Sequence, residues 1–249
     1  MTTAALLEAS LNTDSLQSRL ANWARLPVRP DVEAMLQPAD EWMISAATAS
    51  LLKEMVERLA PMSILEFGAG RSSLILGDAL ATTRGGKLTS IEHQPQYARA
   101  SWERLSQYPG IDAHMITARL GLELTRHGLL HSYTDVAQPL AKRAPYDFVF
   151  VDAPPGHLGR DTALLVAAPY LSPGALIVLD DARRQSEKTT VSRWERVLPI
   201  TRVFESDGIG RGVTVLKLGR TATPAFSLRN FLGTLHDRWL ERRHGAPMP

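Results

Sequence analysis

The stretch ILEFGAGRSS, residues 64–73, joins an apolar run to a glycine-containing turn and to the start of a helical pattern. A strand buried in a parallel sheet is a nearly continuous apolar run, and residues 62–67 form one with two polar exceptions, among them Glu66. Gly68 and Gly70 allow the backbone to turn tightly and to approach a ligand without a side chain in the way. The helix that follows would point free backbone N–H groups at the same place. The stretch therefore predicts a strand, a turn and a helix, which serve either as a ligand site or as a plain connection.

A second acidic residue, Glu92, ends the next apolar run about 24 residues after Gly68, where an acidic side chain can accept hydrogen bonds from a ribose. A dinucleotide site needs a third glycine three residues after Gly70, but Ser73 stands there. The carboxylate of Glu66 would also repel phosphate groups, whereas it suits an ammonium or sulfonium group. These features favour a nucleoside ligand that carries a positive charge and lacks a pyrophosphate.

The motif ILEFGAG followed by Glu92 resembles the first motif of the class I S-adenosylmethionine-dependent methyltransferases, and the resemblance extends over roughly residues 40–218. It implies a Rossmann-like, doubly wound α/β fold with a mostly parallel seven-stranded sheet, a C-terminal antiparallel hairpin and added helices at both ends. It also implies that the turn lies under the methionine part of the cofactor and that Glu92 holds the ribose. The residues to which the resemblance assigns cofactor binding are Glu66, Gly68, Ala69, Gly70, Ser72, Ser73, Glu92, His93 and Asp152.

Length and composition exclude several classes of protein. The 249 residues, 44% of them hydrophobic, can bury one large core, so that a single α/β domain is the simplest expectation. The sequence has no apolar run of about 18 residues and no charged and then apolar leader, so we expect neither a membrane span nor a secretory signal. The lack of cysteine removes disulfides and thiolate chemistry, and we expect a cytoplasmic protein. A formal charge of +2 is too small to indicate a nucleic-acid partner.

The hydrophobic pattern divides the chain into three parts. Residues 1–40 carry apolar helical stripes, which we expect to cap the site or to form a dimer surface. Residues 41–219 are expected to form the methyltransferase domain, whose long segment 121–145 should contain a helix near residues 122–129. Residues 220–249 combine an amphipathic helix with a basic tail, and a second copy of the chain could cover its apolar stripe. We therefore expect a homodimer.

Three carboxylates follow two apolar runs in the second half of the chain: Asp152 ends one run, and Asp180 with Asp181 ends the next. Ligand sites in open α/β sheets lie outside the carboxyl ends of the strands, so these side chains should face the pocket. If the two strands are neighbours, the carboxylates need a cation, and Mg²⁺, then Mn²⁺ or Ca²⁺, suits an oxygen ligand set. In the alternative interpretation, Asp181 caps a helix or pairs with Arg183 or Arg184. Asp152 would then contact only the cofactor or a water molecule.

The phrases YDFVFVDAPPG and PGALIVLDDA, residues 146–156 and 173–182, are similar to small bacterial O-methyltransferases of the catechol-type and sugar-modifying kinds. In those enzymes such acids hold a metal that binds the acceptor hydroxyl, and the catechol-type enzymes have a lysine base where this chain has Pro155. His157 lies on the same loop and could take the proton, or it is an ordinary solvated residue. The resulting catalytic candidates are Asp152, His157 and Asp181, and the metal-binding candidates are Asp152, Asp180 and Asp181.

These residues and the resemblance together predict an S-adenosylmethionine-dependent methyltransferase. Its acceptor would be a small-molecule hydroxyl, on a sugar or a natural-product intermediate, with a divalent metal as a candidate aid to the reaction. One alternative is a non-catalytic partner subunit with a methyltransferase fold, against which an intact cofactor site argues. The other is an enzyme that uses S-adenosylmethionine for a reaction other than methylation, which an analysis of products would reveal.

Overall fold

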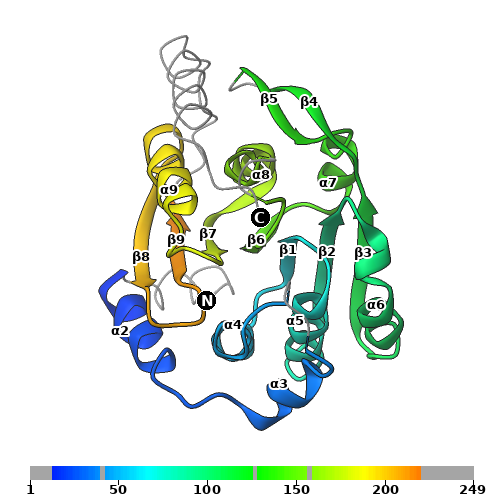
Figure 1. Ribbon diagram of the computed structural model, residues 1–249, viewed down its shortest axis with the longest axis vertical. Coiled ribbons are helices and arrows are strands. Elements are labelled where there is room, and N and C mark those ends of the chain that lie inside the picture. Colours follow the sequence, from blue (N-terminus) through cyan, green and yellow to red (C-terminus); the bar gives the residue numbers. More distant parts are fainter. Residues whose placement is uncertain (1–12, 40–42, 126–127, 156–158, 220–249) are drawn as a thin grey trace, which may run out of the picture.

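The computed structural model describes residues 13–39, 43–125, 128–155 and 159–219, and within them seven strands form one sheet (Figure 1). The strands lie in the order β3-β2-β1-β6-β7-β9-β8, and all are parallel except β9, which runs antiparallel to both of its neighbours. The predicted Rossmann-like sheet with an antiparallel C-terminal hairpin is therefore confirmed. The strands are β1 (Ser63–Phe67), β2 (Gly86–Glu92), β3 (Ile111–Thr117), β6 (Tyr146–Val151), β7 (Leu171–Leu179), β8 (Ile200–Ser206) and β9 (Val213–Leu218).

Helices cover both faces of the sheet, because successive side chains of a strand point to opposite sides. On β1, Ile64 packs into an apolar cluster with the helices on one face, whereas Leu65 packs into a second cluster on the other face. The first face carries α2 (Thr13–Trp23), α3 (Pro30–Met35), α4 (Ala46–Leu59), α5 (Arg71–Ala81) and α6 (Arg99–Leu105) (Figure 1). The second face carries α7 (Ala137–Arg143), α8 (Arg160–Ala167) and α9 (Gln185–Val197). Two short 3₁₀ helices, η1 (Pro95–Tyr97) and η3 (Ala168–Tyr170), lie between these elements.

The prediction of a helix near residues 122–129 is wrong, because this segment contributes to a β-hairpin that is separate from the main sheet (Figure 1). Its strands are β4 (Leu120–Thr125) and β5 (Gly128–Tyr133), which pair antiparallel. The sequence has leucine at every second position from Leu120 to Leu124, which is the period of a strand and not of a helix. The length of the segment alone does not distinguish a helix from a hairpin, whereas this alternation does.

Ion pairs of the buried Lys53 join an N-terminal helix to the domain. Lys53 on α4 has a side chain that is only 3% exposed, and its Nζ lies 2.6 Å from a carboxylate oxygen of Asp31 on α3. The same ammonium group pairs with Asp78 on α5, so that one cation joins three helices. The predicted C-terminal amphipathic helix lies outside the described residues, as does the first part of the predicted N-terminal segment.

Candidate active site

The carboxyl ends of four neighbouring strands meet at one edge of the sheet and are tied together by backbone hydrogen bonds. The N–H of Gly68, after β1, donates to Ile91 of β2 at 2.9 Å. The N–H of Asp152, after β6, donates to Phe67 of β1 at 3.0 Å, and the loop after β7 is joined to β6 in the same way. This is the edge at which open α/β sheets bind ligands.

The glycine turn after β1 has two positions with different requirements. Gly68 has a φ of +100°, and a Cβ there would lie 2.7 Å from the Cβ of Ala153 in the loop after β6. A larger residue at Gly68 is therefore excluded by conformation and by space. Gly70 begins α5, and a Cβ there would meet nothing within 4 Å. The space in front of Gly70 is open to a ligand, and Ala69 between the two glycines is almost fully buried.

The buried carboxylate of Glu66 stabilises this turn through hydrogen bonds. The N–H of Gly70 donates to Oγ of Ser73 at 3.0 Å, and that hydroxyl donates to Oε2 of Glu66 at 2.6 Å. Ser90 of β2 donates to the same carboxylate oxygen. Burial raises the pKa of Glu66 to about 7, against the serine hydroxyls that lower it, since a charge without water around it is unfavourable. Ser72, also buried, directs its hydroxyl to the carbonyl of Gly68 at 3.5 Å.

Glu92 is fixed beside the turn by backbone groups. Its Oε2 accepts a hydrogen bond from the N–H of Ala69 at 3.0 Å. Its Oε1 accepts from the N–H groups of His93 at 2.7 Å and Gln94 at 2.6 Å, and Nδ1 of His93 lies 2.9 Å from the same oxygen. A carboxylate has about four acceptor positions, so Glu92 is oriented but keeps capacity for a further donor. Glu92 thus lies next to the turn, and its role toward a ribose stays a prediction.

Sequence reasoning missed Tyr133, at the end of β5. Its ring centroid lies 5.9 Å from that of Phe67 and 6.2 Å from that of His93. The phenol is buried, and its oxygen has no hydrogen-bond partner within the described part of the chain. Burial, reinforced by the charge of Glu92, raises the pKa of Tyr133 well above its usual value. The signal that could have found it is the strand period of this segment, which was interpreted as a helix.

Sequence reasoning also missed Arg160, which begins α8 and lies among the acidic strand ends. Its side chain is 4% exposed, and its Nη1 lies 3.2 Å from Oδ2 of Asp181 while its Nη2 lies 3.6 Å from Oδ1 of Asp152. Nε donates to the carbonyl of Pro154 at 3.0 Å, and Nη2 donates to the carbonyl of Asp152. The residues that Arg160 contacts are distant in sequence, and no local motif signals such a contact.

The carboxylates expected to bind a metal are arranged differently from that expectation. Asp181 pairs with Arg160, with Arg184 at 2.9 Å and with Arg211 at 2.5 Å, so both of its oxygens face guanidinium groups. Asp180 accepts a hydrogen bond from Thr48 at 3.3 Å. In the part of the chain that the structure describes, no three acidic or histidine residues are grouped so that they could hold a metal ion.

The residues present therefore do not fit a divalent ion, because positive side chains already compensate the carboxylates. The alternative pairing of Asp181 with Arg184 is observed, whereas Arg183 is exposed. Burial raises the pKa values of Asp152 and Asp180 above those of ordinary aspartates, and Arg160 and Arg211 oppose this increase. His157, the other catalytic candidate, lies outside the described residues.

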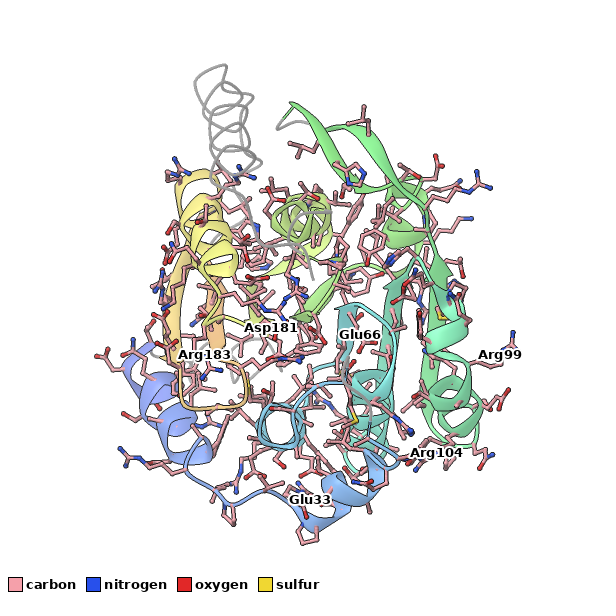
Figure 2. The ribbon with its side chains drawn as sticks, viewed as in Figure 1. Glu33, Glu66, Arg99, Arg104, Asp181 and Arg183 are labelled. Carbon is pink, nitrogen blue, oxygen red and sulfur yellow. The ribbon has the colours of Figure 1, made fainter. Side chains whose placement is uncertain are left out.

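Figure 2 shows Glu66 and Asp181 in the middle of the molecule, with Arg183 close to Asp181 and Glu33 far away near α3. The candidate site thus has two parts that meet at the strand ends. The first is the glycine turn with Glu66 and Glu92, and the second is the acidic group after β6 and β7.

Comparisons with known proteins agree with this arrangement. A family model described as a methyltransferase domain matches residues 65–182, from β1 to the residue after the acidic pair that follows β7. The transmembrane O-methyltransferase of Propithecus coquereli is 30% identical over 132 residues, which are 52% of this chain and 44% of that protein. The chain thus spans less than half the length of the curated relatives that it matches. None of the helices among the described residues has the length and apolar character needed to cross a membrane.

Solved structures share the fold at low sequence identity. The O-methyltransferase TomG from Streptomyces achromogenes, in complex with S-adenosylmethionine, has a TM-score of 0.55 at 20% identity, and the match covers 84% of this chain and 99% of that one. The O-methyltransferase from Bacillus cereus, in complex with S-adenosylhomocysteine, has a TM-score of 0.54 at 17% identity, covering 82% of this chain and 97% of that one. This chain therefore has the fold of these O-methyltransferases, and its residues 65–182 match the methyltransferase-domain family model.

Proposed function

We propose that this protein transfers the methyl group of S-adenosylmethionine to a hydroxyl oxygen of a small molecule. The observation that carries the proposal is the position of Glu92, whose carboxylate is held by the N–H of Ala69 next to the open space at Gly70. A ribose placed there could donate its hydroxyls to Glu92 while the rest of the cofactor lies along the turn. TomG and the Bacillus cereus enzyme, which share the fold, bind this cofactor and its demethylated product.

Different residues have different roles in this proposal. Gly68, Ala69 and Gly70 allow the cofactor to approach the backbone, and Glu92 with His93 holds the ribose side. Ser72, Ser73 and Glu66 are buried behind the turn, so their contribution is to fix its shape and the local charge. We therefore assign Glu66 an indirect role in cofactor binding.

In the reaction, a lone pair of the acceptor oxygen attacks the sulfonium methyl carbon, the carbon–sulfur bond breaks, and a neutral thioether leaves. The acceptor hydroxyl also loses its proton, and a base is useful because an alcohol is a poor nucleophile. Among the described candidates Asp152 fits this task best, since its side chain is 17% exposed whereas that of Asp181 is 3% exposed and surrounded by arginines. His157 remains a second candidate base. Positioning of the two reactants contributes most of the remaining rate enhancement.

The proposed acceptor is a sugar or a natural-product intermediate, as the resemblance to small bacterial O-methyltransferases indicates. We also propose that the protein is a homodimer, since an apolar stripe near the C-terminus of the sequence needs a covering surface. A cytoplasmic location is a separate proposal, which the lack of cysteine supports. Light scattering coupled to size-exclusion chromatography would measure the mass in solution, and a monomer would refute the dimer.

Calorimetry with S-adenosylhomocysteine tests the cofactor assignment. We expect the wild-type chain to bind this ligand and not NAD, and Glu92→Ala to weaken binding by about 1.5–3 kcal/mol, the typical contribution of hydrogen bonds to a charged acceptor. Glu33→Ala is the matched control, because Glu33 is an exposed carboxylate on α3, distant from the turn (Figure 2). Equal affinities of the Glu92→Ala variant and the wild type would remove Glu92 from the site. Tight NAD binding without a response to S-adenosylhomocysteine would refute the proposed function.

A further inference from the structure

Four carboxylates and three guanidinium groups form one cluster at the ends of β6 and β7. The carboxylates, which we call the acidic strand-end cluster, belong to Asp152, Asp180, Asp181 and Glu187, and the guanidinium groups belong to Arg160, Arg184 and Arg211. Asp152, Asp181 and Glu187 form ion pairs with these guanidinium groups, and Asp180 lies in the same electrostatic environment next to Asp181. Three of the four acidic residues are almost fully buried. Buried carboxylates are stable only when positive charge or hydrogen-bond donors compensate them.

Arg160 occupies the centre of this cluster. Its Nη1 lies 3.2 Å from Oδ2 of Asp181 and 3.3 Å from Oε1 of Glu187, and its Nη2 reaches Asp152. It therefore joins three carboxylates that come from the loop after β6, the end of β7 and helix α9. A planar guanidinium with five N–H donors can make several such contacts at once, and it keeps its charge at any ordinary pH.

Arg211 compensates the negative charge of Asp181 at the carboxylate oxygen that Arg160 does not contact. Its Nε lies 2.5 Å from Oδ1 of Asp181, and Nη2 donates to the carbonyl of Met43 at 3.4 Å. Arg184 lies 2.9 Å from Oδ2 of the same carboxylate. An ion bound to Asp181 would thus lie next to guanidinium groups on both oxygens, and repulsion between these charges would oppose its binding.

We propose that Arg160, supported by Arg211, takes the place of a divalent metal ion at these strand ends. The proposal rests on the methyltransferase function proposed above and adds that the cofactor and acceptor sites are complete without a metal. Arg160 acts as a positioning residue: it holds Asp152 and the loop after β6 against the end of β7, which a bridging ion would otherwise do. Unlike a bound ion, it cannot be removed by a chelator.

Mn²⁺ alone is a suitable probe, because its free form gives an electron paramagnetic resonance signal that binding diminishes. When the full chain has been treated with a chelator and then freed of it, we expect the signal of free Mn²⁺ to be the same with the protein as in buffer alone. The affinity for S-adenosylhomocysteine should change by less than about twofold between excess chelator and excess Mg²⁺, since an ion that does not bind contributes nothing by linkage. One Mn²⁺ bound per wild-type chain, and lost in Asp181→Asn, would overturn the proposal.

Removal of a guanidinium should make the cluster responsive to the probe. Arg211→Gln is the primary variant, since its side chain is 35% exposed and the change is compatible with folding. We expect Mn²⁺ to raise the thermal midpoint of unfolding of this variant. The electron paramagnetic resonance signal of free Mn²⁺ should fall when the variant is added, whereas the wild type should show neither effect. Arg183→Gln is the control, because Arg183 is exposed beside the cluster and forms no ion pair with a carboxylate in the described residues (Figure 2).

Arg160→Gln should show the larger response to Mn²⁺ if it folds, because it removes the central charge. A folded Arg211→Gln variant that behaves like Arg183→Gln toward Mn²⁺ would refute the replacement of an ion by these arginines. Failure of the wild type to bind S-adenosylhomocysteine would instead refute the proposed function. The comparison of the variants with Mn²⁺ would still test whether the arginines replace an ion.

Discussion

Glu66→Gln should remove part of the pH dependence of folding. The carboxyl group of Glu66 has no exposed surface, and its pKa is raised from 4.5 to about 7, chiefly by burial and in part by the nearby charge of Glu92. Between these two values the folded chain holds a proton that the unfolded chain has lost. The corresponding stability is fully present below the unfolded pKa and is lost as the pH rises through the folded pKa.

The magnitude follows from the difference between the two pKa values. One pKa unit corresponds to about 1.4 kcal/mol, so the free energy of unfolding should fall by about 2.5 kcal/mol between about pH 5 and about pH 8 on account of this group alone. Glutamine is neutral and nearly isosteric, and its amide oxygen can accept the hydrogen bonds from Ser73 and Ser90. The variant should therefore match the wild type at the lower pH and exceed its stability at the higher one.

Urea unfolding followed by circular dichroism at the two pH values gives the required free energies. Other buried carboxylates, such as Asp152 and Asp147, also have raised pKa values and contribute to the slope of both proteins. For this reason the decisive quantity is the difference between wild type and variant at each pH, in which those contributions cancel. If that difference is the same at both pH values, the pKa of Glu66 is not raised and the reasoning from burial is refuted.

Two further substitutions test the turn and the hairpin. Gly68→Ala should destabilise the fold by about 1–3 kcal/mol and greatly weaken binding of S-adenosylhomocysteine, because the positive φ and the nearby Ala153 exclude a Cβ. Calorimetry and urea unfolding measure both effects, and normal stability with normal binding would contradict the close packing. Tyr133→Phe should leave stability unchanged or raise it by about 1 kcal/mol, because the hydroxyl is buried without a partner in the described chain. A loss of more than about 1 kcal/mol would show that this hydroxyl does have a partner.

The sequence predicted the order of β1, turn and α5, and β1 itself to within about one residue, because an apolar run, two glycines and a helical pattern are all local signals. Glu92 lies beside the turn because adjacent parallel strands place their carboxyl ends together, and the predicted contact of Glu92 with a ribose stays a prediction. The hairpin formed by β4 and β5 differs from the predicted helix, because the length of a segment does not fix its type and the alternating leucines of β4 favour a strand.

The ion pairs of the acidic strand-end cluster could not have been predicted in this way. Arg160 reaches Asp181 and Glu187, which are 21 and more residues away in the chain, and only the packing of α8 against the strand ends brings them together. A sequence shows that three acids need compensation, but it does not show which of its 28 basic residues provides it. The choice between a metal ion and an arginine depends on that tertiary contact.

The ion pairs of Lys53 make the N-terminal helices an unsuitable unit for exchange between relatives. The ammonium group pairs with Asp31 of α3 and Asp78 of α5 as well as with Glu57 of its own helix, and apolar residues of α2 and α3 enter the same core cluster as those of α4. A transplanted α2–α3 segment would bring carboxylates and apolar side chains that fit only this α4 and α5. Evolutionary change in this region should therefore occur by coordinated substitutions across all four helices, and the junctions of a chimera should lie outside them.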